Sequence, residues 1–121
     1  MSLLSGQSWQ LDRYARFVCD ANKSVKDGKW KYYDDTSGHI VMTLTDVMQL
    51  IISQNTVILE SHSLVRAQCW MRGLSRNDSL LFMYKFQSET RKFRVRFSKK
   101  DDVSGTEICT KVIHQLSRFS L

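Results

Sequence analysis

The sequence has no apolar run near the roughly 20 residues that a bilayer-spanning helix needs, and its start lacks the basic and long apolar segments of a signal peptide. These absences argue against a membrane-embedded or secreted protein. We therefore expect a soluble protein with no membrane partner. Proline is also absent, which is compatible with many folds and excludes none.

Cysteine is scarce as well. Cys19, Cys69 and Cys109 are an odd number of residues at wide and unmatched spacing. This pattern suits neither a disulfide framework nor a zinc site. We interpret the three as reduced thiols of a protein in the cytosol or nucleus.

Motifs of catalysis are also missing. The chain has no nucleophile elbow, no phosphate-cradling glycine loop and no His-Glu zinc helix. The histidines are far apart: we place His39 at the start of a strand, His62 in a polar turn and His114 on a terminal helix. Each is interpreted as structural or solvated rather than as a ligand. The sequence thus predicts no enzyme, no cofactor and no metal site.

What is present fits one globular domain over residues 1–121, since 42% of the residues are hydrophobic and 25% are charged. The net charge of +6 is uneven: residues 63–100 hold ten Lys or Arg and two acids, whereas the rest of the chain holds eight Lys or Arg and ten acids. A basic face attracts acidic peptides, phosphates or nucleic acid, or is merely solvated, and the composition does not choose among these.

Apolar alternation predicts a series of short strands. In the first of them, Trp9, Leu11, Ala15 and Phe17 are expected on one side. The segment 63–74 fits either a short helix or an irregular strand and is left open. The other strands are expected at 29–34, 39–45, 49–53 and 56–60, and the first spans 9–18.

The clearest element is a hairpin of residues 79–86 and 91–98 around the turn 87–90. With Phe86 opposite Arg91, one face is apolar and the other is mixed. The apolar face pairs Tyr84 with Phe93, Phe82 with Val95 and Leu80 with Phe97. The mixed face pairs Lys85 with Lys92, Met83 with Arg94 and Leu81 with Arg96.

A helix is expected over about 104–119, because Ser104 and Glu107 have the spacing of a capping box. Its apolar stripe is predicted to hold Ile108, Val112, Ile113, Leu116 and Phe119. About seven strands followed by one terminal helix predict a mainly β, α+β fold of the pleckstrin-homology-like type, with two packed antiparallel sheets and a capping helix. An SH3-like or OB barrel is the main rival, though neither normally ends in such a helix.

The mixed face of the hairpin is the candidate binding site. Leu81 and Met83 point away from the aromatic core and are flanked by Arg94 and Arg96. Apolar anchors rimmed by arginine are typical of a protein-binding patch. Alternatively, the segment 63–74 or an N-terminal arm covers this strip. The predicted partner-binding residues are Leu81, Met83, Arg94, Arg96, Arg72 and Leu74.

Phosphate-bearing lipids and DNA are two alternative ligands. Lys23, Lys26 and Lys29 form a possible anion site like that of lipid-binding pleckstrin-homology domains, but the acids Asp34 and Asp35 that follow would repel phosphate. The charge of the basic segment 63–100 also allows weak contact with DNA. Its phenylalanines are expected in the core, however, and so are not free to stack on bases.

Short motifs spread along nearly the whole chain form one further pattern. They are Trp9, Arg13-Tyr14-Ala15-Arg16-Phe17-Val18, Ser37-Gly38, Ile52-Ser53-Gln54, Leu59-Glu60, Ser63-Leu64, Trp70, Leu80-Leu81-Phe82, Phe93-Arg94-Val95 and Phe97-Ser98. Together these motifs resemble the N-terminal domain of the Rec-one-fourteen family of meiotic recombination proteins. The resemblance implies a pleckstrin-homology-like scaffold in the nucleus, on meiotic chromosomes, that helps programmed double-strand break formation. It places Leu81 and Arg94 at family positions of peptide contact.

The same resemblance implies partners. They are C-terminal peptides of the regulatory B subunit of a topoisomerase-VI-like complex and of an ankyrin-repeat protein, and a second accessory protein bound through a C-terminal segment that this sequence does not contain. The chain departs from the family pattern in the loop 23–29 and at Met83-Tyr84-Lys85. These departures concern the choice of partner.

Overall fold

The computed structural model describes residues 6–18, 28–87 and 89–117. Strands and one α-helix make up most of this part of the chain, and no helix in it is long and apolar enough to cross a membrane. Residues 35–37 and 67–69 form single 3₁₀ turns. The elements are β1 (Gly6–Val18), β2 (Lys29–Asp34), β3 (Ile40–Thr45), β4 (Gln49–Gln54), β5 (Val57–Ser63), β6 (Met71–Arg76), β7 (Ser79–Phe86), β8 (Glu89–Phe97) and α1 (Gly105–Leu116).

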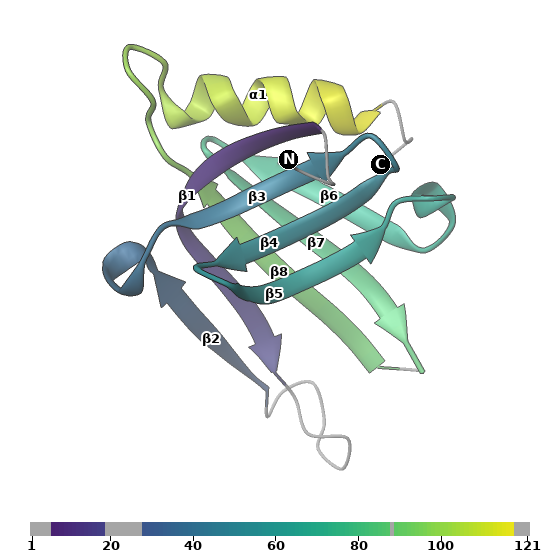
Figure 1. Cartoon of the computed structure of the whole chain (residues 1–121). Coiled ribbons are helices and arrows are strands. Elements are labelled where there is room, and N and C mark those ends of the chain that lie inside the picture. The colour runs from purple at the N-terminus through teal and green to yellow at the C-terminus, as the bar shows by residue number, and fades with distance from the viewer. Residues whose placement is uncertain (1–5, 19–27, 88, 118–121) are drawn as a thin grey trace.

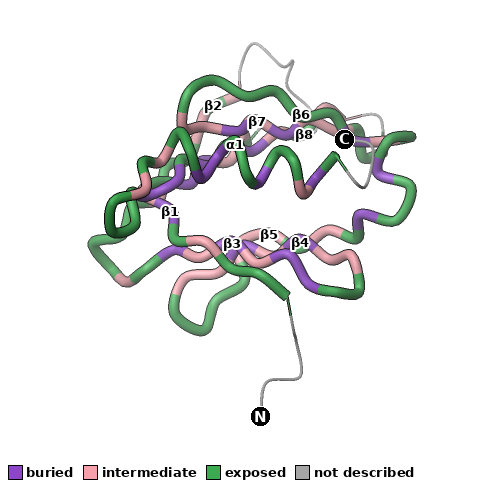
Figure 2. The backbone as a smooth tube through the Cα atoms, turned by 90° about the horizontal axis from the view of Figure 1, so that it is seen from above, coloured by how far each residue is buried: buried purple, intermediate pink, exposed green. Residues whose placement is uncertain are grey.

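The strands are antiparallel and follow the order β5-β4-β3-β1-β8-β7-β6, with β2 added beside β1. Seen from above, they form two layers, β3, β4 and β5 in one and β2, β6, β7 and β8 in the other (Figure 2). The long strand β1 serves both layers, because residues 6–11 pair with β3 and residues 13–18 pair with β2. Its register against β8 shifts between Leu11 and Arg13, and such a bulge bends a strand.

Helix α1 lies across one open end of the two layers (Figure 1). It begins as predicted: the Ser104 hydroxyl accepts a hydrogen bond of 3.2 Å from the Glu107 backbone N–H. The stripe is only partly as expected, because Ile113 is 37% exposed and Cys109 is buried instead. Ile113 therefore lies at the edge of the buried side of the helix. Phe119 falls outside the described residues, so its predicted place in the stripe is not tested. The buried helix residues are Ile108, Cys109, Val112 and Leu116.

Two packed layers of antiparallel strands closed by a terminal helix are the pleckstrin-homology-like α+β fold that the sequence predicts. The segment 63–74, left open above, contains a 3₁₀ turn at residues 67–69 and then the start of β6. Leu64, Ala67 and Met71 of this segment are buried in the core. The segment therefore forms neither a regular helix nor one irregular strand.

The predicted register of the hairpin is wrong by two residues. Phe86 pairs with Glu89 rather than with Arg91, and Phe82 pairs with Phe93, so that their rings stack at 4.7 Å between centroids. Gln87 adopts a left-handed conformation with φ of 51°, which suits a tight turn and lets residues 89 and 90 extend β8. An even shift leaves every side chain on its predicted face.

Two inner residues also differ from expectation. The bulge in β1 turns Tyr14 into the core, where it is fully buried, and places Ala15 and Phe17 on the opposite face. His62 lies within β5 rather than in a polar turn, and its ring stacks on Phe93 at 5.2 Å between centroids. The side chains that face the core therefore change from odd-numbered to even-numbered residues within β1. A prediction from strict alternation cannot include such a change.

Candidate functional site

The outer face of the layer β2-β1-β8-β7-β6, hereafter the outer face, points away from the core and carries the predicted binding residues. Leu74 of β6 lies opposite Leu81 of β7, which lies opposite Arg94 of β8. In the adjacent row, Arg72 lies opposite Met83. The structure therefore brings five of the six predicted residues into two neighbouring rows.

Arg96 stands in the next row of the same face. It pairs with Ser79 on one side and with Arg13 of β1 on the other. The pairings predicted for Leu81 with Arg96 and for Met83 with Arg94 are thus wrong, since Leu81 faces Arg94 and Met83 faces Lys92. The shared face is unchanged, because the register error is even.

The segment 63–74 does not cover the apolar strip, which consists of Leu74, Leu81 and Met83. Its last residues enter β6, which lies beside β7 and contributes Arg72 and Leu74 to the outer face. Leu74 is 59% exposed, whereas Leu81 and Met83 are half-buried. An N-terminal arm over the strip would fall in residues outside the described part. Within the described part, the strip is an apolar surface open to a partner.

A set of cation–aromatic contacts extends the outer face onto β1 and β2, and sequence reasoning missed it. Lys92 Nζ lies 4.7 Å from the ring centroid of Phe17, and Arg94 Cζ lies 5.3 Å from that of Trp30. Tyr32, two residues after Trp30, is 58% exposed on the same face. The alternation of Trp30 and Tyr32 would have signalled this surface had the pairing of β1 with β2 been predicted.

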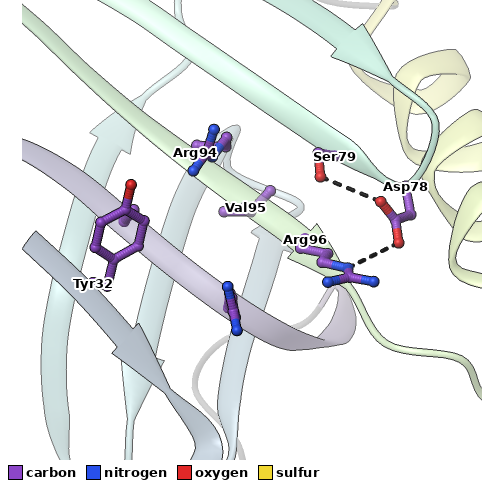
Figure 3. A pocket seen from close by; sticks show the side chains of 8 residues that line it. Tyr32, Asp78, Ser79, Arg94, Val95 and Arg96 are labelled. Atoms are coloured by element: carbon purple, nitrogen blue, oxygen red, sulfur yellow. Dashed lines mark hydrogen bonds and ion pairs between the residues drawn. The ribbon is translucent and has the colours of Figure 1, made fainter. Parts of the chain in front are cut away.

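A pocket of about 230 Å³ opens on this face, between β2, β1 and β8 (Figure 3). Ala15, paired with both Arg94 and Tyr32, is the small residue between two long ones. At one end Arg96 Nε donates to Asp78 Oδ2 at 3.0 Å. The lining residues with polar side-chain ends are Arg13, Tyr32, Asp78, Ser79, Arg94 and Arg96.

Positive charge dominates the outer face. On this face Asp78 pairs with Arg96, and Asp34 accepts hydrogen bonds from the hydroxyl and backbone N–H of Thr36. These bonds, with a smaller contribution from Arg13, lower the pKa of the Asp34 carboxyl. A surface with this excess of guanidinium and ammonium groups suits acidic ligands. Its cations include Arg13, Arg72, Arg76, Lys85, Lys92, Arg94 and Arg96.

The second predicted site is not assembled in the described residues. Lys23 and Lys26 fall outside them, and Lys29 begins β2 as an exposed residue. The same part of the chain contains no group of three His, Cys, Asp or Glu side chains that could hold a metal ion. His39 and His114 are exposed, and the latter lies on α1.

The two described cysteines are free thiols in different settings. Cys69 is exposed, whereas Cys109 lies on the buried side of α1, with its Sγ 3.7 Å from the backbone carbonyl of Ser79. Burial, with a further contribution from the nearby Asp78 carboxylate, raises the pKa of the Cys109 thiol. A buried thiol that stays protonated is unreactive, so Cys109 acts as a core residue.

Comparison with known proteins identifies the family. A model of the family described as "Meiotic recombination protein REC114-like" matches residues 9–121. The human protein "Meiotic recombination protein REC114" is 28% identical over 133 residues, which cover 98% of this chain and 50% of the human protein. The chain thus spans half the length of that relative. Because the family match runs from β1 through α1 and includes the whole outer face, the chain belongs to the REC114-like family of meiotic recombination proteins.

Proposed function

We propose that this chain is a non-enzymatic docking domain of a meiotic recombination accessory protein, which binds peptide segments of partner proteins on its outer face. The observation that carries the proposal is the strip of Leu74, Leu81 and Met83 among arginines on one open surface. Apolar anchors give burial, and guanidinium groups give directed hydrogen bonds.

We infer that the strip binds a peptide segment rather than a globular partner. Leu74 and Leu81 lie directly opposite each other on neighbouring strands, as do Arg72 and Met83. An apolar partner residue placed between these two rows would contact Leu81 and Met83. Its carboxylates or backbone carbonyls would reach Arg94 on β8 and Arg72 on β6. Two rows of this kind accommodate a short stretch of chain with alternating apolar and acidic groups.

Family membership supports the meiotic setting. We infer action in the nucleus, on meiotic chromosomes, as a scaffold in the machinery that forms DNA double-strand breaks. The proposed partners are C-terminal peptides of the regulatory B subunit of the topoisomerase-VI-like complex and of the ankyrin-repeat protein. A second accessory protein would bind through a family segment beyond this chain.

The test is binding of the purified chain to labelled peptides of these two partners. Leu81→Asp should abolish binding, because truncating or charging a central anchor typically costs about 2 kcal/mol or more. The matched control is Ile58→Asp, the same change at a residue of β5 that is 62% exposed and lies in the other layer. It should leave binding intact.

Thermal melting of both variants separates loss of binding from loss of fold. A Leu81→Asp variant that melts like wild type and still binds normally would show that the outer face is not the docking surface. If neither peptide binds the wild-type chain, acidic liposomes and DNA are the next ligands. Binding to DNA would fall steeply with salt and would not depend on Leu81.

A further inference from the structure

Three arginines, Arg13, Arg94 and Arg96, and one acid, Asp78, line the pocket beside the apolar strip. Arg13 of β1 lies directly opposite Arg96 of β8, and Arg94 lies two residues along the same face. Like charges directly opposite each other destabilise a sheet. An anion bound between them would relieve this repulsion.

Two carboxylates, those of Asp78 and Asp34, offset part of the charge of these three arginines. Arg96 is bonded to Asp78, whose other oxygen is 3.3 Å from the Ser79 hydroxyl. Arg94 lies over Trp30, whereas Arg13 lies opposite Asp34 of β2 and interacts with its carboxylate electrostatically. The pocket thus holds three guanidinium groups and one carboxylate.

The donor set suits a tetrahedral dianion better than a carboxylate. A carboxylate offers two oxygens and one negative charge, whereas a phosphate monoester offers three terminal oxygens and a charge of about −1.5 to −2 at neutral pH. Each arginine presents a planar fork of donors that matches phosphate oxygens, and the Tyr32 hydroxyl lines the same hollow. Figure 3 shows Tyr32, Arg94 and Arg96 around this space.

The position of the pocket indicates where the phosphate comes from. Arg94 lines the pocket and is also the cross-strand neighbour of Leu81, so a segment seated on the strip passes within reach of the hollow. We propose that the pocket binds the phosphate of a phosphorylated serine or threonine in the docked segment, so that phosphorylation of the partner strengthens docking. This inference rests on the proposed docking function.

The first test uses O-phosphoserine as the probe and follows the arginine Nε–H signals by NMR at constant pH and ionic strength. Phosphoserine should shift the signals of Arg13, Arg94 and Arg96 saturably, and L-glutamate should bind about tenfold more weakly because it carries one charge less at the pocket. Equal responses to both probes would overturn the proposal.

Arg13→Gln is the informative variant, because Arg13 lines the pocket but is not part of the apolar strip. It should weaken phosphoserine binding about tenfold. Arg72→Gln, the same change at an exposed arginine of the outer face that does not line the pocket, is the matched control and should leave phosphoserine binding unchanged. Equal loss in both variants would mean that the response reflects general surface charge.

The two proposals fail in different ways. Leu74→Ser changes the strip without touching the pocket, so it should weaken peptide docking and leave phosphoserine binding intact. If peptides dock on wild type and phosphoserine does not shift the pocket arginines, the phosphate site is wrong and the docking surface stands. If phosphoserine binds and no peptide docks, the docking proposal fails, and with it the assignment of the phosphate to a docked segment.

Discussion

The Tyr14 hydroxyl donates a hydrogen bond of 2.6 Å to Glu60 Oε1, across 46 residues of sequence and between the two layers. Glu60 Oε2 lies 2.8 Å from His62 Nε2, and the His62 ring stacks on Phe93. Burial, reinforced by the bond to Glu60, raises the pKa of the Tyr14 phenol far above its ordinary range. Tyr14 therefore remains a hydrogen-bond donor at physiological pH and ties β1 to β5.

Replacing Tyr14 by Phe should destabilise the fold. The change removes a donor from the Glu60 carboxylate, whose side chain is only 9% exposed, and losing a bond to a buried charged group costs about 1–3 kcal/mol. Chemical denaturation measures the loss. Tyr32→Phe is the matched control, since Tyr32 is 58% exposed, and it should be near neutral. Equal unfolding midpoints for the two variants would contradict this role of Tyr14.

The same bond predicts a dependence on alkaline pH. Because the folded-state pKa of Tyr14 is raised, its contribution is fully present below the unfolded value of about 10 and is lost as the pH rises toward the folded value. The unfolding free energy of wild type should therefore fall more steeply between about pH 9 and 11 than that of Tyr14→Phe. Parallel curves for the two proteins would show that Tyr14 ionises alike in both states.

Ser104→Ala should destabilise α1 by about 1 kcal/mol, because the Ser104 hydroxyl satisfies the Glu107 N–H at the helix start. Thermal or urea unfolding measures the change. Ser104→Asp should retain stability, because a carboxylate caps equally well and also favours the positive end of the helix. If alanine and aspartate behave alike at this position, the cap contributes nothing.

The cysteines should react unequally with a thiol reagent. In a Cys19→Ser background, exposed Cys69 should be labelled quickly at pH 8, whereas Cys109 should react only after unfolding. Burial raises the pKa of Cys109, so its protonated form is favoured in the folded protein and persists as the pH rises past the ordinary thiol value. Mass spectrometry of labelled peptides distinguishes the sites. Rapid labelling of Cys109 in the folded protein would mean that α1 opens readily.

Arg72 should affect docking mainly through long-range charge. It is exposed on the edge strand β6 at the rim of the strip. Removing a rim charge typically changes the association rate and its salt dependence more than the dissociation rate. Stopped-flow or surface-based kinetics of Arg72→Gln at two salt concentrations would measure this, and the milder anchor truncation Leu81→Ala should mainly raise the dissociation rate. A change confined to dissociation would place Arg72 among the central anchors.

Much of the candidate site could be predicted because strand alternation is a local property. Leu81, Met83, Arg94 and Arg96 share the outer face in any register that differs by an even number of residues. The predicted face is therefore correct even though the predicted register is wrong by two residues. The start of α1 could be predicted for the same reason, because a capping box lies within four consecutive residues.

Tertiary structure decided what depends on neighbours distant in sequence. The tight turn at Gln87 set the hairpin register, and the bulge in β1 exchanged Ala15 for Tyr14 in the core. Pairing of β6 with β7 brought Leu74 beside Leu81, pairing of β1 with β8 brought Arg13 beside Arg96, and pairing of β2 with β1 added Tyr32 to the pocket. Alternation along one strand determines which way a side chain points, whereas the strands that lie beside it follow from long-range pairing and packing, which no local pattern encodes.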